Sequence, residues 1–270
     1  MGAAYILGKN AFDGGDLANA DVRFYSLNSA AGGGFGSIVV PLGDIDADGN
    51  EDVGFGWSGY TNSRGALAIY LGPFSGGNDA ADADAFVTGL GSAFVTFHAA
   101  TARAGDTDGD GTDDLVFGAP ETHQGSDMSY AGQVYLVSGG GVLSGTDVQL
   151  ADATIEGTHY AQQLGRSVTT MGDQDGDGFA DIGVGAWGDD TEADYGGGAF
   201  LFYGPLSGTS EPGDADASWH GVSRGASAGV SVIGGVELTG DSYADLVIGA
   251  EAANGTADYS GIVYVVPGGP

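Results

Sequence analysis

The chain has 270 residues, of which 42% are apolar, and this is enough to bury a substantial core. Lysine and arginine total 6 against 37 aspartates and glutamates, and the net charge of −31 argues against nucleic acids and anionic membranes as partners. A cation is the natural counterpart of this charge. Cysteine is absent, which excludes a cysteine nucleophile. No segment approaches the roughly 18 apolar residues of a membrane span.

The first predicted elements are two short strands, Ala3–Leu7 and Asp21–Leu27, which form a partial unit over residues 1–28. They resemble the third and fourth strands of the units that follow. The opening letters MGAAYILGKNAF contain no basic region before a long apolar run, so no signal peptide is expected in this sequence.

Four units follow, over residues 29–89, 90–157, 158–221 and 222–270, each with strands that we call a, b, c and d in chain order. Lengths near six residues and alternating branched or aromatic residues predict half-buried antiparallel strands. The last unit has no strand d of its own. The expected strands are Phe35–Leu42, Val53–Trp57, Ala66–Leu71 and Ala83–Thr88; Phe97–Ala104, Leu115–Ala119, Gln133–Ser138 and Ala151–Glu156; Leu164–Met171, Ile182–Ala186, Ala199–Tyr203 and Ala215–Trp219; Ala228–Gly235, Leu246–Ala250 and Ile262–Val266.

An acidic loop joins strands a and b in every unit. The loops read DIDADGNED from Asp44, DTDGDGTDD from Asp106, DQDGDGFAD from Asp173 and, in weaker form, ELTGDSYAD from Glu237. Their spacing of roughly 64 residues is typical of an array of repeated supersecondary units. Small residues in strand a favour radial packing of several sheets over a β-sandwich.

The acidic loops have the composition of calcium sites. Carboxylates at positions 1, 3, 5 and 9, with a backbone carbonyl at position 7, supply the six to eight oxygens that calcium prefers, and glycine at position 6 permits a left-handed turn. Magnesium prefers a smaller octahedral shell, and zinc prefers Cys or His. The expected ligands are Asp44, Asp46, Asp48, Asn50 and Asp52; Asp106, Asp108, Asp110, Thr112 and Asp114; Asp173, Asp175, Asp177, Phe179 and Asp181; and Glu237, Thr239, Asp241, Tyr243 and Asp245.

The fourth loop is degenerate, since Thr239 replaces an acid and Ser242 replaces the glycine, so three sites and a weakened fourth are expected. An EF-hand is excluded because Phe, Val or Ile stands at position 12 and a strand follows the loop. An Asp-Gly turn without an ion is the alternative, but four aspartates would then repel one another in each of three loops. We expect the ion to stabilise the fold by joining strands a and b.

The residues around the loops carry a resemblance. Phe35-Gly36 and Leu164-Gly165 open two strands a, and Gly118-Ala119-Pro120 closes a strand b. This pattern resembles FG-GAP repeats, the units of the integrin α-subunit β-propeller. The resemblance implies an all-β propeller of four-stranded antiparallel blades, bound calcium, an extracellular or cell-surface location and a role in protein recognition or adhesion. Integrin propellers have seven blades, so the number of blades, and pairing of the terminal strands with a second chain, stay open.

The b–c loops lie on the rim opposite the calcium loops, and aromatic and polar loop residues are typical of recognition surfaces. By resemblance, this rim would bind a protein or peptide, and a glycan is the alternative ligand. For each residue singly, a solvated loop position is an equal alternative. The candidate partner-binding residues are Trp57, Tyr60, Arg64, His123, Tyr130, Trp187 and Tyr195.

Catalysis is not expected. The four histidines are scattered and form no H-E-x-x-H pair, and no G-x-S-x-G elbow is present. Acid pairs for glycoside hydrolysis stay open in so acidic a chain. FG-GAP-like repeats also accompany secreted hydrolases, so an accessory domain of such an enzyme, or a carbohydrate-binding propeller, is the alternative function.

Overall fold

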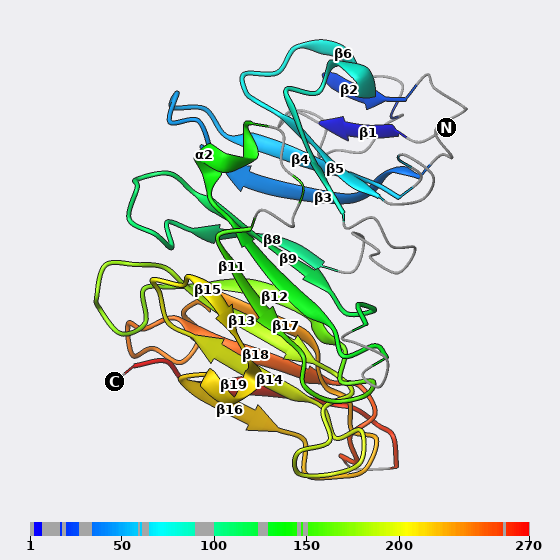
Figure 1. Cartoon of the computed structure of the whole chain (residues 1–270), viewed down its shortest axis with the longest axis vertical. Coiled ribbons are helices and arrows are strands. Elements are labelled where there is room, and N and C mark those ends of the chain that lie inside the picture. The colour runs from blue at the N-terminus through cyan, green and yellow to red at the C-terminus, as the bar shows by residue number, and fades with distance from the viewer. Residues whose placement is uncertain are drawn as a thin grey trace. The chain divides into compact units, whose positions relative to one another are not determined.

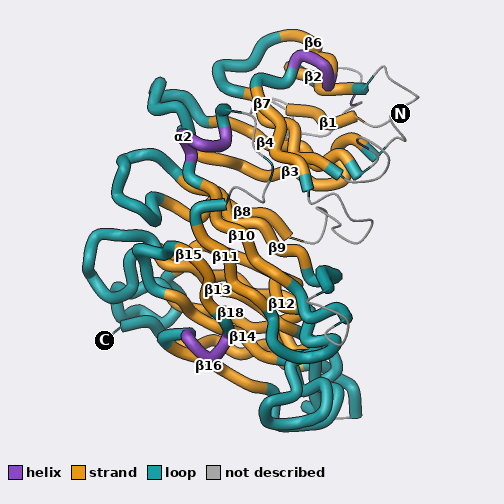
Figure 2. The backbone as a smooth tube through the Cα atoms, viewed as in Figure 1, coloured by secondary structure: helices purple, strands orange, loops and turns teal. Residues whose placement is uncertain are grey.

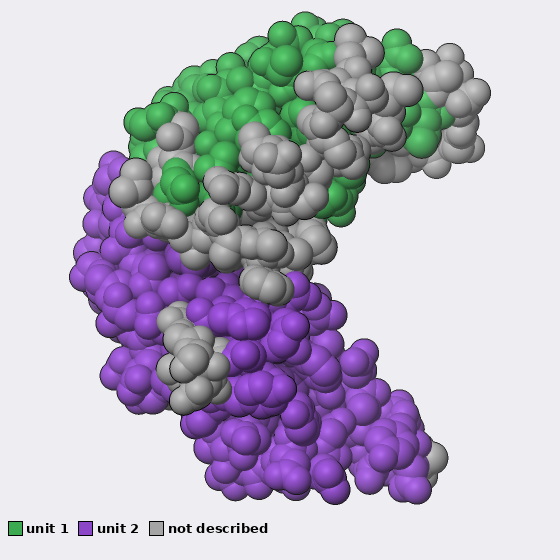
Figure 3. All heavy atoms as spheres, turned by 45° about the vertical axis from the view of Figure 1, so that its right-hand side comes forward, with its two compact units in different colours: residues 1–98, 140–149 green, residues 99–139, 150–270 purple. Residues whose placement is uncertain are grey.

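The computed structural model of the chain has an all-β fold of the β-propeller class, built around four-stranded antiparallel sheets (Figure 1). Strands dominate, and the helices are single short turns (Figure 2). The structure describes residues 3–6, 17, 20–26, 34–58, 60, 65–89, 100–123, 129–144, 147, 151–255 and 258–269. It contains two compact units, residues 1–98 with 140–149 and residues 99–139 with 150–270 (Figure 3).

Unit 1 contains two sheets. One has the order β3-β4-β5-β7 and is antiparallel throughout, and the other has the order β1-β2-β6, in which β6 runs parallel to β2. The elements are β1 (Ala3–Ile6), β2 (Val22–Tyr25), β3 (Phe35–Gly43), β4 (Asp52–Trp57), β5 (Ala66–Tyr70), β6 (Gly76–Asp79), the 3-10 helix η4 (Ala80–Asp82) and β7 (Ala85–Thr88).

An aromatic cluster joins the two sheets of unit 1. The ring of Phe24 on β2 lies 4.6 Å from that of Phe55 and 4.7 Å from that of Tyr70, measured between ring centroids. Phe35 and Trp57 extend the cluster, and all five side chains are buried. Aromatic pairs at these separations stabilise a core beyond the burial of their area, so the partial N-terminal sheet is held by packing.

Unit 2 contains three sheets, with the orders β15-β11-β10-β9-β8, β12-β13-β14-β16 and β17-β18-β19. Its strands are β8 (Ala100–Gly105), β9 (Asp114–Ala119), β10 (Gln133–Val137), β11 (Ala153–Glu156), β12 (Leu164–Gly172), β13 (Asp181–Ala186), β14 (Gly198–Phe202), β15 (Gly208–Ser210), β16 (Ala217–His220), β17 (Ala228–Val236), β18 (Asp245–Ala250) and β19 (Ile262–Val266). The helix α2 (Gly139–Val142) follows β10, and the 3-10 helix η6 (Pro212–Asp214) precedes β16.

The inner strands β8, β12 and β17 of unit 2 lie side by side, as the small residues of strand a predict. Glycine is required where the backbones cross. A Cβ added to Gly118 would lie 2.0 Å from the carbonyl oxygen of Gly165, and one added to Gly185 would lie 2.1 Å from that of Gly229. Each contact joins strand b of one sheet to strand a of the next, so the paired glycines of the repeat allow the sheets to pack closely.

The expectation of half-buried strands is wrong for several central strands, since β5, β9 and β10 are buried throughout and the two central strands of the middle sheet of unit 2 are as well. Every residue of β13 and of β14 is buried. Val184 and Phe202 pack in the core shared with the β8–β11 sheet, while Ala199 and Leu201 pack in the core shared with the β17–β19 sheet. Both faces of the sheet are covered, and this removes the polar face that an exposed antiparallel sheet would show.

Two strands were not expected from the sequence. β6 and β15 come from the c–d connections and pair in parallel with the strand d of another sheet, β6 with β2 and β15 with β11. A parallel bridge between Thr88 and Asp147 repeats this arrangement. The polar, glycine-containing sequences GGND and GTS have little β-propensity, but covering a sheet edge needs only backbone groups. The sheet containing β15 therefore has five strands.

Each observed strand d begins two residues later than expected, at Ala85, Ala153 or Ala217. An aspartate precedes each of these alanines, and its backbone N–H bonds to strand c while its side chain accepts a second bond just after that strand. In the third repeat, the Asp216 carboxylate accepts a hydrogen bond of 2.8 Å from the backbone N–H of Tyr203, at the end of strand c. Asp84 and Asp152 accept equivalent bonds.

Within the described residues, no helix is long and apolar enough to span a bilayer.

Candidate metal loops

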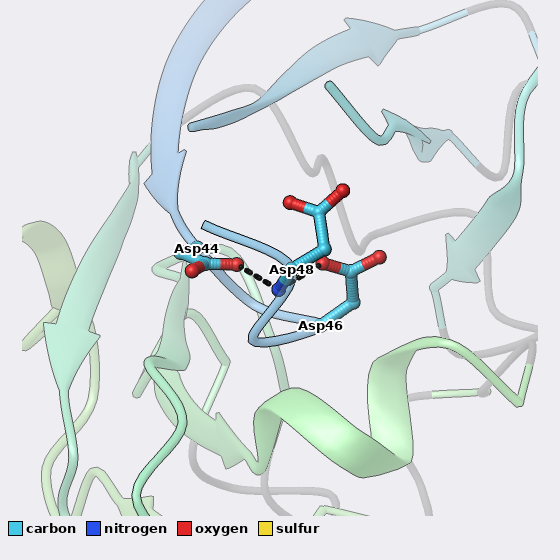
Figure 4. Close-up of side chains that lie close together, drawn as sticks. All are labelled: Asp44, Asp46 and Asp48. Atoms are coloured by element: carbon cyan, nitrogen blue, oxygen red, sulfur yellow. Dashed lines mark hydrogen bonds between the residues drawn. The ribbon is translucent and has the colours of Figure 1, made fainter. Parts of the chain in front are cut away.

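Three acidic loops gather carboxylates in the structure. In each of the first three loops, carboxylate oxygens from three aspartates lie within 4.8 Å of one another. Figure 4 shows the first group, formed by Asp44, Asp46 and Asp48 on one turn of the chain. The other two groups contain positions 1, 3 and 9 of their loops, namely Asp106, Asp108 and Asp114, and Asp173, Asp175 and Asp181.

The aspartate at position 1 organises each of these loops through backbone hydrogen bonds. The two carboxylate oxygens of Asp44 accept from the N–H groups of Asp48 and Gly49, at 3.0 and 2.8 Å. Asp106 and Asp173 accept equivalent bonds from their own loops. The backbone of each loop therefore closes around the carboxylate at position 1 through several N–H groups.

The aspartate at position 9 is different because it is buried and joins three segments. One oxygen of Asp181 accepts from the N–H of Gln174 at loop position 2 (2.6 Å), and the other accepts from the N–H of Gly204 just after strand c (2.9 Å). Asp52, Asp114 and Asp245 make the same pair of contacts. The acidic loop is thus connected to strand c as well as to strands a and b.

The glycine that follows strand c is a site residue that the sequence argument missed. Gly72, Gly139, Gly204 and Gly268 each stand two residues after the end of a strand c and donate to the position-9 aspartate. Their recurrence at one place in every repeat was the available signal. The bond they make is long-range, and no local pattern in the acidic loop reveals it.

Burial changes the acidity of the position-9 carboxyls. Desolvation raises the pKa of Asp181 to about 6, although the hydrogen bonds from Gln174 and Gly204 oppose this shift. Desolvation likewise raises the pKa values of Asp52 and Asp114. The pKa of Asp245 is lowered instead, chiefly by the hydrogen bond from Gly268. The acids that surround the first three carboxyls also raise their pKa values, and a bound cation would relieve this repulsion.

The fourth loop is arranged differently. The Thr239 hydroxyl donates toward Asp241 and Asp245, over 3.0 and 3.2 Å. Position 3 of the fourth loop is therefore a neutral hydrogen-bond donor, whereas the other loops have an aspartate there. Glu237 accepts from the backbone N–H of Gly240. No group of three acids within 4.8 Å is found here among the described residues. The donor set of the fourth loop thus differs from that of the other three, and a weaker fourth site stays a prediction.

The chain was compared with known proteins. A model of the FG-GAP repeat matches residues 99–137, which contain the second acidic loop. Integrin alpha-PS2 of Drosophila melanogaster is 31% identical over 252 residues, covering 88% of this chain and 17% of the relative. Integrin alpha-5 of Xenopus laevis is 28% identical over 229 residues, covering 82% and 20%, and integrin alpha-IIb of Homo sapiens is 26% identical over 260 residues, covering 90% and 22%. The chain belongs to the FG-GAP repeat family.

The FG-GAP chain spans about a fifth of the length of these integrin α relatives. The likeness extends well beyond the 99–137 match and covers most of the present sequence. It therefore supports an integrin-like propeller built from this repeat, as the resemblance in the sequence implies.

On the opposite rim, the FG-GAP repeats present tyrosines in a recurring and unusual backbone conformation. Tyr130, Tyr195 and Tyr259 each stand three residues before a strand c, with φ of 60°, 52° and 55°. Their exposed fractions are 38%, 47% and 75%. A bulky residue in the left-handed region is strained and persists only where its surroundings fix it. Tyr259 was not among the candidates chosen from the sequence.

The other rim candidates of the FG-GAP chain are less exposed. Trp57, chosen as a recognition residue, is instead only 5% exposed and packs edge-on against Phe35 with ring centroids 5.7 Å apart, so that expectation is wrong. The Tyr60 ring lies between those of Trp57 and Phe86. Trp57, at the end of this strand b, and Tyr60 after it therefore belong to the packed core of unit 1. Arg64 lies outside the described residues.

His123 and Trp187 are half-buried. The His123 ring lies 4.8 Å from that of Tyr130, and the Trp187 indole N–H donates to the Gln163 side chain. The first contact lies within one b–c loop, and the second joins the following b–c loop to the segment that precedes β12. Both residues therefore support the loops that carry the exposed tyrosines.

A buried carboxylate holds the third b–c loop of the FG-GAP chain. Asp189 is 1% exposed, accepts a hydrogen bond of 2.8 Å from the Gln162 side chain and contacts His220 Nδ1 at 3.1 Å. Burial opposes ionisation, but hydrogen bonds from Gln162, Thr191 and His220 outweigh it and lower the pKa of Asp189. This aspartate ties the loop to β16, which gives His220 a structural partner that its position in the sequence does not reveal.

Proposed function

We propose that the chain is a calcium-binding, integrin-like β-propeller whose first three acidic loops hold structural Ca²⁺. The observation that carries the proposal is the buried carboxylate at position 9. It belongs to the acid group in the second and third loops. In all four repeats it also accepts a hydrogen bond from the glycine that follows strand c. An ion held by such a loop would fix the relative positions of strands a, b and c. Its contribution to stability follows from linkage, because the unfolded chain has no preformed site.

The donor set of the loops fits calcium. The grouped atoms are carboxylate oxygens, and calcium accepts six to eight oxygen ligands in flexible geometry. The proposed ligands are the residues at positions 1, 3, 5, 7 and 9 of the first three loops, with position 7 contributing its backbone carbonyl. Asn50, Thr112 and Phe179 stand at that position. The ion would supply positive charge at the place where the fold concentrates acids.

Recognition is the second part of the proposal. The loops that join strands b and c carry exposed tyrosines in strained backbone conformations, held by hydrogen bonds such as that from Ser227 N–H to the Tyr195 carbonyl. Strain of this kind collects at functional sites. With the family membership, it supports an extracellular module that recognises a protein or peptide on this rim and has no catalytic role.

The calcium affinity of the third loop should decrease when the pH is lowered. The pKa of Asp181 is about 6 without an ion, so this carboxyl is ionised at pH 7.5 and largely protonated at pH 5. A bound proton must leave before Ca²⁺ binds, which should weaken binding there about tenfold between these pH values. The folded pKa lies above the ordinary value, so the same group stabilises the calcium-free fold as pH falls from 6 toward 4. Isothermal titration calorimetry at both pH values measures the change in affinity. An equal affinity at both values would contradict the proposed role of Asp181.

Tyr195→Ala should weaken partner binding about tenfold, because exposed aromatic anchors dominate recognition surfaces. Binders would first be identified on arrays of extracellular proteins, peptides and glycans in calcium, and their affinities then compared by surface plasmon resonance. Tyr243→Ala is the matched control, since Tyr243 is 45% exposed and lies on an acidic loop. Equal loss in both variants would argue against the rim, and binding to glycans alone would replace the protein partner.

A further inference from the structure

One peptide group links the second and third acidic loops in unit 2. The backbone N–H of Ala180, at position 8 of the third loop, donates a hydrogen bond of 2.8 Å to the carbonyl oxygen of Asp106. Asp106 is position 1 of the second loop, where its side chain belongs to the acid group. The other end of the same peptide group is the Phe179 carbonyl, at position 7 of the third loop. The peptide therefore contacts the proposed ligands of both sites.

Close packing reinforces this link. A Cβ added to Gly109, at position 4 of the second loop, would lie 2.8 Å from the Phe179 ring, and one added to Gly105 would lie 2.7 Å from the Ala180 side chain. Gly204, which donates to Asp181, is wedged between Phe179 and the Thr107 carbonyl. The two loops are close-packed at these contacts, so a shift of either loop displaces atoms of the other.

The third and fourth loops lack this connection. Ala244 is the counterpart of Ala180, but no backbone hydrogen bond joins it to Asp173 in the described part of unit 2. Gly176, the counterpart of Gly109, has no atom within 4 Å of an added Cβ, so no aromatic ring covers it. Within the described part of unit 2, this link therefore joins the second and third loops and not the third and fourth, and the latter pair provides an internal comparison.

Resting on the proposed calcium role, we propose that the second and third loops bind Ca²⁺ cooperatively, through the Phe179–Ala180 peptide group. The Phe179 carbonyl would be restrained when the third loop holds calcium, and the same peptide group would then order the Ala180 N–H against Asp106 and place the second loop in its binding conformation. Calcium binding at the second loop would then carry a smaller ordering cost. Such coupling is reciprocal and typically about 5- to 150-fold in affinity, and we expect the low end of this range, about five- to tenfold.

The test is a calcium titration of the full chain followed by NMR, using the amide signals of Gly111 and Gly178 to report the second and third loops separately. In Asp173→Asn with Asp175→Asn, the third loop is disabled, and the calcium affinity of the second loop should fall about five- to tenfold. Phe179→Ala keeps the backbone carbonyl and removes the ring, so it should give part of this loss. Tyr243→Ala, at the same position of the fourth loop, should leave the second loop unchanged.

Two results would overturn the inference, and they differ in what they say about calcium. If both loops bind calcium but the second loop keeps its affinity when the third is disabled, the loops are independent and the structural calcium role stands. If neither Gly111 nor Gly178 responds to calcium in the unmodified chain, the proposed function fails as well. Thermal unfolding of each variant in calcium would show whether it folds, and Phe179→Ala keeps the test valid if the double variant does not.

Discussion

Removing calcium should lower the midpoint of thermal unfolding of this chain by at least about 10 °C. A ligand present at 100 times its Kd stabilises the folded state by about 2.7 kcal/mol per site, and two of the three proposed sites lie in unit 2. A change of 1 kcal/mol shifts the midpoint by about 2–4 °C for a body of this size. Calorimetry in 1 mM calcium, which is about 100 times a Kd on the order of 10⁻⁵ M, and in excess chelator measures the shift.

Two controls separate a specific site from general screening of the charge of −31. Magnesium at the same concentration screens the acids equally, but a small ion with an octahedral shell should restore much less stability. Asp108→Asn with Asp110→Asn should remove part of the calcium response, and the chelated protein should lose little stability because each side chain keeps the one oxygen that accepts its backbone hydrogen bond. An identical midpoint in calcium and in chelator would contradict the structural role.

Asp181→Ala should destabilise unit 2 by about 2–4 kcal/mol even without calcium. The carboxylate is fully buried and is the acceptor for the N–H groups of Gln174 and Gly204. Each buried N–H left without an acceptor costs about 1–3 kcal/mol, and the relief of repulsion with neighbouring acids offsets part of this loss. Urea unfolding at pH 7 in chelator gives the free-energy difference.

Asp177→Ala is the matched control for this substitution. It removes the same charge from the same loop, but Asp177 is exposed and accepts one loop hydrogen bond, from Phe179 N–H. Its effect on the chelated protein should be below about 1 kcal/mol. If both variants unfold at the same urea concentration, the bonds from the position-9 aspartate to strand c contribute nothing measurable.

The elements that could be predicted from the sequence are those fixed by local chemistry. Aspartates at alternate positions with a glycine at position 6 define the loop in the first three repeats, and the branched residues after the loop define strand b in all four, so even the altered fourth loop was found. The period of the loops then indicated the repeated sheets. β6 and β15 could not be found in this way, because GGND and GTS become strands only when another sheet edge is available.

On the rim, too, the sequence predicted some features correctly and not others. Tyr130 and Tyr195 were chosen as exposed aromatic residues and are exposed, whereas Trp57 was chosen on the same grounds and is buried against Phe35. Composition does not distinguish these residues, because all three are aromatic and stand at or after the end of strand b. Packing against Phe35 on the adjacent strand β3 decides that Trp57 is covered.

The sequence by itself determined the repeat, the place of the acidic loops and the chemistry of the ion they would take, since each depends on residues within about ten positions of one another. Only the tertiary structure decided that Asp181 reaches Gly204 and that Ala180 reaches Asp106. These bonds join residues separated by a strand pair or by a whole repeat. They form because packed sheets bring distant backbone groups together and exclude the water that would otherwise satisfy them.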